Sequence, residues 1–337
     1  MAAVSDIGID LGTSNVVIYA RNRGIVLDEP AVVALERDTR VIRAIGMEAY
    51  RMIGRTPSGI VAMRPLREGS VADFELTSSM LHHFVVQVIG KRMFSRPRAV
   101  LSLPSGINEN EKRNISAVMF EAGVRRTQLL DRPVAAAIGA DMNINEVYGS
   151  MVVDIGAGMT DIAVLSTGRV VVSDAVKLGG DHFDDAIIRY LRRKYNLLVG
   201  ERTAEELKIA IGGAMPRREQ MYMDVTGRNL ISGLPKLMRI TSDEIFEAID
   251  DPLTALIEAI HAVLEHTPAE LAADVFDAGI MLTGGGARLT GLADAITTAL
   301  KVECHVAENP QNCVATGCGR TLENLADYGR YLNDRRS

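Results

Sequence analysis

The sequence predicts an α/β fold with two similar domains and a cleft between them. Two stretches, 6–19 and 152–165, look like copies of each other. In each copy an apolar strand runs into Asp-x-Gly, continues through small or hydroxyl residues, and leads into a second apolar strand. Strand and helix patterns alternate after each copy. The repeated unit is about 144 residues long. This length indicates two similar domains, each with a central sheet flanked by helices, and such pairs of domains enclose a cleft.

The elements of the first half follow from the hydrophobic pattern and from turn residues. A turn ending in Gly24 follows the first hairpin and leads into a third strand, 25–27, whereas segment 28–75 gives mixed signals. Gly123 is suited to end a helix and Pro133 to begin one. The elements predicted after this segment alternate: helix 76–89, strand 99–103, helix 111–122, strand 127–130 and helix 134–138.

The second half restarts the same pattern at Val152. A turn at 166–169 follows the second hairpin and leads into a third strand, 170–172. We expect the charged tail, 327–337, to be partly disordered. The helices predicted in this half are 184–195, 204–211, 242–265 and 289–300.

Composition excludes several classes of function. The chain has 337 residues, of which 47% are apolar and 24% charged, as in an ordinary globular protein. A net charge of −6, the absence of Trp and an aromatic content of only 4% argue against a nucleic-acid partner. Three cysteines without metal-ligand spacing, together with the lack of a signal-peptide pattern, indicate reduced thiols in a cytoplasmic protein. No apolar run is long enough to span a membrane.

The two hairpins have the features of a phosphate clamp. Each turn offers backbone N–H groups to phosphate oxygens, and Asp10 and Asp154 could hold Mg²⁺ directly or through water. An ordinary hairpin turn is the alternative for either copy alone. The second copy favours the clamp.

Three further motifs fit a nucleotide site. Glycines 284–286 end an apolar strand and would let a flat ring or a ribose approach the backbone. Glu205 and Lys208 share one face of a predicted helix and could reach a nucleoside, although a surface salt bridge is the alternative. Segment 315–319, Ala-Thr-Gly-Cys-Gly, would let a helix pack closely at a hinge, and simple helix packing without a ligand role is its alternative.

Together these motifs resemble the superfamily of actin, heat-shock chaperones and sugar kinases, and within it the MreB-like bacterial actins. The segments that carry the resemblance are DIGIDLGTSN (6–15), LLDRPVAAAIGA (129–140), DIGAGMTDIAV (154–164), GERTAEELK (200–208), LTGGGARLTGL (282–292) and ATGCG (315–319). Segments 24–35, 53–75, 103–115, 178–187 and 266–286 extend the resemblance over nearly the whole chain.

The resemblance implies an actin-like fold with ATP and Mg²⁺ in the cleft. Domain I would comprise 1–148 and 310–337, and domain II would comprise 149–309. It also implies filaments of this chain on the inner face of the cytoplasmic membrane, where membrane proteins of wall synthesis and rod shape are the partners. No nucleic-acid partner is expected.

The resemblance assigns the site residues by position. Asp10 and Asp154 would organise Mg²⁺ and its waters. The residues that would contact the phosphates are Gly12, Thr13, Ser14 and Asn15 on one side and Gly156, Ala157, Gly158, Met159 and Thr160 on the other. The residues that would contact the nucleoside are Glu205, Glu206, Leu207, Lys208, Gly284, Gly285, Gly286, Ala287 and Arg288.

Two positions depart from the pattern of the family. Arg132 stands where the family usually has a Glu that helps to position the attacking water, and Met159 stands in place of a Thr with a similar role. Met offers no useful hydrogen bond, and Arg cannot act as a base near neutral pH. Since transfer of a phosphoryl group to water requires a positioned nucleophile, we expect weak or absent hydrolysis.

Two alternatives would preserve hydrolysis. Asp131 could replace the lost carboxylate from the neighbouring position, or Arg132 could stabilise transferred charge as an arginine finger does. Arg132 is also expected at a helix N-terminus, which disfavours a cation by about 0.3–1 kcal/mol. A nearby anion such as a γ-phosphate could offset this cost.

Segment 91–98 combines four cations with Met93 and Phe94. The family carries a small apolar membrane-insertion loop at this place. Met93 and Phe94 could enter the headgroup boundary while the cations meet anionic lipid. A solvated basic turn is the alternative.

Three rival functions remain at this stage. A small-molecule kinase of the same superfamily would need a catalytic Asp facing an acceptor, and no separate substrate pocket is indicated. A chaperone ATPase would need a substrate-binding domain, which we do not expect in a chain ending at Ser337. A non-hydrolysing paralogue that copolymerises with an active MreB overlaps with the main interpretation.

Overall fold

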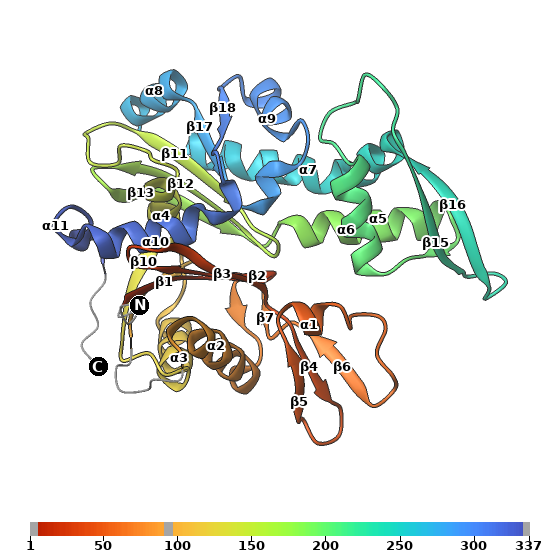
Figure 1. The fold of residues 1–337 in the computed structure, drawn as a ribbon. Helices are drawn as coiled ribbons and strands as arrows, with labels where there is room; N and C mark the ends of the chain where they lie inside the picture. The colour runs from red at the N-terminus through yellow and green to blue at the C-terminus, as the bar shows by residue number, and fades with distance from the viewer. Residues whose placement is uncertain (1–5, 91–96, 333–337) are drawn as a thin grey trace.

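The computed structural model describes residues 6–90 and 97–332. Figure 1 shows one five-stranded sheet in the lower half of the molecule and a second in the upper half. The first sheet has the order β10-β9-β1-β2-β3, in which β1 to β3 are antiparallel neighbours and β9 and β10 run parallel to β1. Its strands are β1 (Asp6–Leu11), β2 (Asn15–Ala20), β3 (Gly24–Pro30), β9 (Arg98–Leu103) and β10 (Arg126–Asp131).

The second sheet repeats the topology of the first. Its order is β13-β12-β11-β17-β18, again with an antiparallel set of three strands and two strands parallel to the first of them. Its strands are β11 (Ser150–Ile155), β12 (Thr160–Ser166), β13 (Arg169–Val176), β17 (Ile280–Thr283) and β18 (Cys304–Val306). The repeat read from the sequence is therefore a repeat of mixed sheets, and the predicted α/β class is confirmed.

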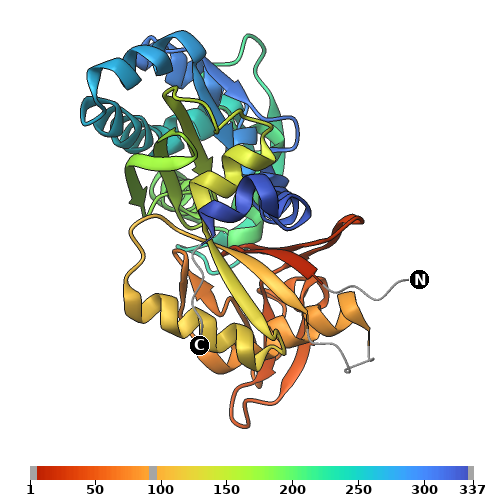
Figure 2. The same cartoon turned by 90° about the vertical axis from the view of Figure 1, so that its left-hand side faces the viewer.

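Two helices lie between the sheets, α4 (Arg132–Gly139) and α10 (Cys313–Glu323), as Figures 1 and 2 show. They pack closely because a Cβ atom at Gly317 would collide with the Ala135 carbonyl, and one at Gly139 would collide with the Cys313 carbonyl. The close helix contact expected from segment 315–319 is therefore present.

The outer faces of the sheets carry most of the remaining large helices. The lower sheet has α2 (Phe74–Ile89) and α3 (Glu109–Glu121), and the upper sheet has α7 (Ser242–Glu265), α8 (Ala269–Ala278) and α9 (Leu292–Leu300). Helix α5 (Gly180–Tyr195) packs against α7 and extends to the side of the upper sheet. Side chains cap several of them. Asp73 accepts from the Leu76 N–H, and Thr241 forms a capping box with Glu244. No helix in the described part of the chain has both the length and the apolar character that a membrane span requires.

Each sheet carries a small lobe on one side of the cleft. The lower lobe holds β4 (Val33–Glu36), β5 (Ile42–Ile45), β6 (Ile60–Met63) and α1 (Met47–Tyr50), followed by the short pair β7 (Leu66–Arg67) and β8 (Ser70–Val71). The upper lobe holds β14 (Leu197–Leu198), α6 (Glu201–Ile211), β15 (Tyr222–Asn229) and β16 (Pro235–Thr241). The remaining elements are α11 (Leu325–Tyr328) and three 3₁₀ turns, Gly285–Arg288, Pro310–Asn312 and Gly329–Tyr331.

The structure describes the charged tail as far as Leu332. There Tyr331 is buried and its hydroxyl donates a hydrogen bond to Asn145. The Tyr331 ring packs under the β12–β13 turn, where a Cβ atom at Gly168 would collide with it.

Candidate functional site

A cavity of about 580 Å³ lies between the two sheets and their lobes. Its size suits a small-molecule or cofactor site. Both hairpin turns contribute to its wall, as do α6 and the 3₁₀ turn after β17. The expected site residues on the wall are Asp10, Gly12, Thr13, Ser14, Asn15, Arg132, Asp154, Gly156, Ala157, Gly158, Met159, Glu205, Lys208, Gly284, Gly285, Gly286 and Arg288.

Five expected residues lie off this wall, each for a local reason. Leu207 and Ala287 are buried in the hydrophobic core beside the upper sheet. Thr160 is fully buried and its hydroxyl donates to the Leu178 carbonyl. Glu206 faces outward and pairs with Arg202, and Asp131 is exposed at the end of β10. Helical and strand periodicity explain the pattern, since neighbours of a wall residue point elsewhere.

The two hairpin turns have the same backbone geometry. The Gly12 N–H donates to the Asn15 carbonyl at 3.0 Å, and the Gly156 N–H donates to the Met159 carbonyl at 2.9 Å. The turns face each other closely, because a Cβ atom at Gly158 would lie 2.8 Å from Thr13 Oγ1. Such paired turns present backbone donors to one anion from two sides.

Met159 reaches across the cleft. A Cβ atom at Gly69 would collide with its sulfur, so Met159 packs against the β7–β8 turn of the lower unit. Gly69 has a positive φ of 75°, which favours glycine there. The Gly69 N–H also donates to Thr13 Oγ1 at 3.3 Å. A thioether thus lies at the place where the resemblance puts a water-positioning hydroxyl.

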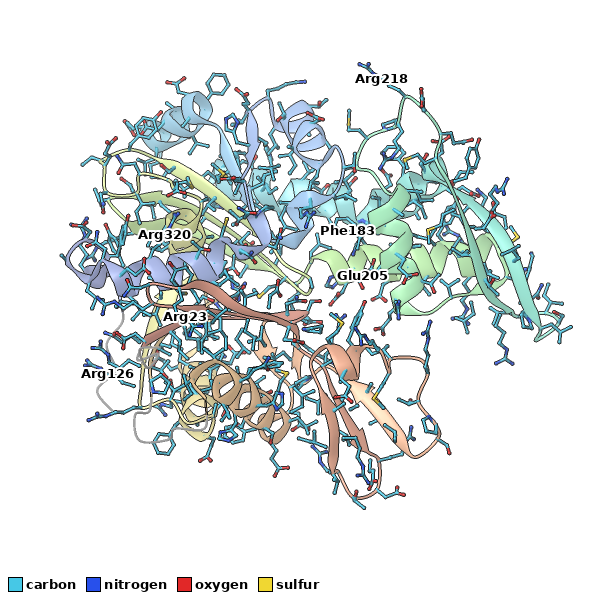
Figure 3. All side chains as sticks on the ribbon, in the orientation of Figure 1. Arg23, Arg126, Phe183, Glu205, Arg218 and Arg320 are labelled. Atoms are coloured by element: carbon cyan, nitrogen blue, oxygen red, sulfur yellow. The ribbon has the colours of Figure 1, made fainter. Side chains whose placement is uncertain are left out.

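The far side of the cavity is formed by α6 and the glycine-rich turn. Figure 3 shows Glu205 on the lower edge of α6, facing the lobe that carries α1. There Glu205 accepts a hydrogen bond from the Tyr50 hydroxyl at 2.8 Å, which ties the two lobes together. Lys208 donates to the Gly180 carbonyl and to Asp184, each at 2.9 Å. At Gly285 a Cβ atom would meet nothing, so this wall is open to a ligand.

Several wall residues were not identified from the sequence. They are Leu11, Val17, Asp28, Gly69, Gly180, Asp181, Phe183, Ile209, Leu289, Thr290 and Gln311. Most of them belong to segments that carried the resemblance, and that signal could have found them: Leu11, Asp28, Gly69, Gly180, Asp181, Phe183, Leu289 and Thr290. Asp28 accepts a hydrogen bond from Asn15 at 2.7 Å, which only the paired strands reveal. Arg64 also bridges the cleft, to Asp181 at 3.2 Å.

Arg132 occupies the floor of the cavity, at the start of α4. It is 7% exposed, and its guanidinium donates to Asp10 at 2.7 Å and to Asp154 at 3.3 Å. Asp161 lies 3.9 Å from its Nε atom. The anions that offset the unfavourable helix position are therefore carboxylates of the protein, two of them from the upper unit.

The matches to known proteins agree with this geometry. A family model described as MreB/Mbl protein matches residues 4–330. The chain belongs to the MreB/Mbl family. It is 46% identical over 320 residues to the cell shape-determining protein Mbl of Bacillus subtilis (strain 168), covering 95% of this chain and 96% of that protein. It is 44% identical over 330 residues to the cell shape-determining protein MreB of Escherichia coli (strain K12), covering 96% and 95%.

Solved structures give the same assignment. MreB5 of Spiroplasma citri bound to ADP has a TM-score of 0.91 and 34% identity, over 96% of this chain and 98% of that one. The same protein bound to AMPPNP has a TM-score of 0.92. The expected actin-like fold is confirmed, and the family is one of cell shape-determining cytoskeletal proteins. The kinase and the regulatory paralogue are not favoured.

A buried arginine among carboxyl groups distinguishes the cleft of this MreB/Mbl protein from the pattern expected for the family. Burial raises the pKa of Asp10, although Arg132 opposes the shift. Burial likewise raises the pKa of Asp161 to about 7, again against Arg132. Burial disfavours the charged guanidinium, but the three carboxylates outweigh it and raise the pKa of Arg132, which stays charged.

The residues present do not fit a Mg²⁺ ion between Asp10 and Asp154. The Arg132 guanidinium already contacts one oxygen of each carboxylate, and the other oxygen of Asp154 accepts from Thr283 at 2.9 Å. A dication about 4 Å from the guanidinium would be repelled by about 8 kcal/mol at an effective dielectric constant of about 20. No group of three or more potential ligands from His, Cys, Asp and Glu gathers elsewhere in the described residues.

Proposed function

We propose that this MreB/Mbl chain is an ATP-binding subunit of cytoskeletal filaments that determine cell shape. The observation that carries the proposal is the pair of matched hairpin turns, which face each other across the cavity with the same internal hydrogen bond. The nucleotides bound to MreB5, which shares the fold at 34% identity, support it.

Each part of the nucleotide has a matching wall in this proposal. The backbone donors of the turns at Gly12–Asn15 and Gly156–Met159 would hold the phosphates. The nucleoside would lie between α6 and the Gly284–Arg288 turn, beside Glu205 and Lys208. The proposed domain boundaries, 1–148 with 310–337 and 149–309, put one hairpin in each domain. Nucleotide binding would then join the domains, and filament assembly would respond to the nucleotide state.

Hydrolysis is slow in this proposal. Arg132 is held by carboxylates and offers no base, and the Met159 thioether cannot position water. Asp131 does not compensate, because it is exposed and lies off the cavity wall. The arginine-finger alternative would still lack a group that positions the water, and Asp10 and Asp154 already offset the charge of the guanidinium. Asp10 and Asp154 would not hold Mg²⁺, because both carboxylates are already paired with Arg132.

The filament would lie at the inner face of the cytoplasmic membrane, with wall-synthesis or shape-determining membrane proteins as partners. Met93 and Phe94, the residues of the proposed membrane contact, fall outside the described residues. One small loop binds weakly, so attachment would depend on many subunits acting together. Replacing both residues by Ser should abolish co-sedimentation with anionic liposomes while filament pelleting without lipid persists. Unchanged liposome binding would refute the contact.

A pair of glycine variants tests the proposed function. Gly285→Leu adds a side chain to the open cavity wall, and Gly59→Leu adds one to open space outside the cavity. We expect wild type and Gly59→Leu to bind ATP in equilibrium dialysis and to pellet as filaments with ATP. Gly285→Leu should lose both properties while keeping its unfolding temperature. Equal ATP binding by all three proteins would refute the site, and ATP binding without pelleting in wild type would refute the filament.

A further inference from the structure

Arg132 is the ion-pair partner of both aspartates at the floor of the cavity. Asp10 and Asp154 occupy equivalent places in the two hairpin repeats, and the guanidinium lies between them at 2.7 and 3.3 Å. Within the described part of the chain, no other cationic side chain forms a salt bridge with either of them. The guanidinium therefore occupies the position between the repeats where a shared cation would otherwise lie.

The contacts around Arg132 hold it in that position. Its side chain is 8% exposed, and Asp161 adds a third carboxyl group 3.9 Å from Nε. The carboxylates are themselves fixed. Ser102 donates to Asp10 at 3.3 Å, Thr283 to Asp154 at 2.9 Å, and the Ser105 N–H to Asp161 at 2.7 Å. A buried cation with three such partners is strongly held, because removing it would leave uncompensated negative charge.

Arg132 also lines the cavity beside both hairpin turns. A guanidinium has five N–H donors in a planar fork, and those not used by carboxylates suit phosphate oxygens. Exchanging a glutamate, the residue that the resemblance places here, for arginine changes the charge of the site by about two units, the same as one Mg²⁺ ion. The arginine therefore matches one Mg²⁺ ion both in the charge that it adds and in its position between the two aspartates.

We propose that the Arg132 guanidinium, paired with Asp10 and Asp154, replaces the divalent cation of this site, so that the cleft binds a nucleoside di- or triphosphate without Mg²⁺. The inference rests on the proposed nucleotide function. It is separate from the proposal of slow hydrolysis, because it concerns the affinity for the nucleotide and not the rate at which ATP is hydrolysed. The protein would stay loaded when free Mg²⁺ is removed.

Affinities for ADP and for AMPPNP, each measured by calorimetry in excess EDTA and in excess Mg²⁺, test this directly. For wild type we expect the two dissociation constants to agree within about threefold. For Arg132→Glu we expect nucleotide binding in Mg²⁺ and a loss of at least about tenfold in EDTA. Arg132→Lys keeps the charge and should be less dependent on Mg²⁺ than Arg132→Glu. Arg239→Gln removes an arginine from an exposed pair with Asp224, far from the cavity, and should behave as wild type.

Binding by wild type only in Mg²⁺ would overturn this inference and leave the proposed function standing. No binding of either nucleotide in either buffer would overturn both. Mn²⁺, used in place of Mg²⁺, tests the same inference on the wild-type protein alone. An electron paramagnetic resonance signal of Mn²⁺ bound stoichiometrically to the wild-type ADP complex would also overturn the inference.

Discussion

The guanidinium of Arg132 and the carboxylate of Asp154 meet at 3.3 Å, one from the helix between the sheets and one from the central strand of the upper sheet. With Asp10 at 2.7 Å, this contact ties both hairpin repeats to one side chain. Arg132 therefore has a structural role as well as a place on the cavity wall, and the two roles predict different results when it is replaced.

Arg132→Gln should destabilise the protein in the absence of metal. It leaves three buried carboxylates without a cation, and breaking a buried pair in this way costs about 3–5 kcal/mol of the free energy of unfolding. Mg²⁺ should restore much of this loss in the variant and change wild type little. Urea unfolding followed by circular dichroism, with EDTA or Mg²⁺, measures both effects.

The matched control is Arg239→Gln, whose exposed ion pair should contribute at most about 1 kcal/mol. A loss in Arg132→Gln that Mg²⁺ does not reduce would mean that the aspartates cannot accept the ion even when the guanidinium is absent.

Tyr50→Phe should speed the release of nucleotide. The Tyr50 hydroxyl joins the lower lobe to Glu205 on the cavity wall through a hydrogen bond of 2.8 Å. Burial and this bond raise the pKa of Tyr50 to about 12, so the hydroxyl remains a donor at neutral pH. Loss of about 1 kcal/mol would raise the dissociation rate about fivefold.

Stopped-flow chase of a fluorescent ADP derivative measures that rate. Tyr222→Phe is the control and should leave the rate unchanged, because it removes an exposed hydroxyl of β15 that donates only to nearby Gln220. Equal rates in wild type and Tyr50→Phe would show that this contact does not restrain the nucleotide.

The sequence predicted best the features that depend on local order. The Asp-x-Gly hairpins and the helix 242–265, which the structure places at Ser242–Glu265 behind a Thr241 cap, were recognisable because their signals lie within a few residues. The two small lobes were missed, since strands such as β15 are half exposed and are defined by pairing with β14 and β16. Arg132 was identified as unusual, but its partners lie 22 to 122 positions away, and only the fold brings them together.

Stability should fall as the pH rises through the range in which Asp184 ionises. Burial raises the pKa of Asp184 to about 6, although Lys208 opposes the shift, whereas in the unfolded chain the value is 3.8. Between about pH 4 and 6 the native state therefore holds a proton that the unfolded state has lost. This contribution is complete below pH 4, is lost above pH 6, and amounts to about 3 kcal/mol.

Asp184→Asn should flatten this part of the profile of unfolding free energy against pH, measured with urea at a series of pH values. Asp224→Asn is the control, because the hydrogen bond from Arg239 lowers the pKa of the exposed Asp224 and gives a dependence of opposite sign. An unchanged slope in Asp184→Asn would assign the pH dependence to other groups.

Restoring two side chains should restore hydrolysis. The double variant Arg132→Glu, Met159→Thr returns a carboxylate and a hydroxyl to the positions from which the resemblance expects water to be oriented. Proton transfer by a positioned group contributes about 10²- to 10⁴-fold, so we expect phosphate release from ATP to rise by at least about tenfold over wild type. Nucleotide binding by the double variant should also require Mg²⁺, because the variant lacks the guanidinium that pairs with Asp10 and Asp154. Continuous phosphate detection with ATP, Mg²⁺ and anionic liposomes measures the rate.

Met159→Thr alone should gain little activity, since the protonated guanidinium of Arg132 still cannot accept a proton from water. Comparable release by wild type and double variant would mean that another group positions the water, and loss of the wild-type rate in Asp131→Asn would then identify Asp131 as that group.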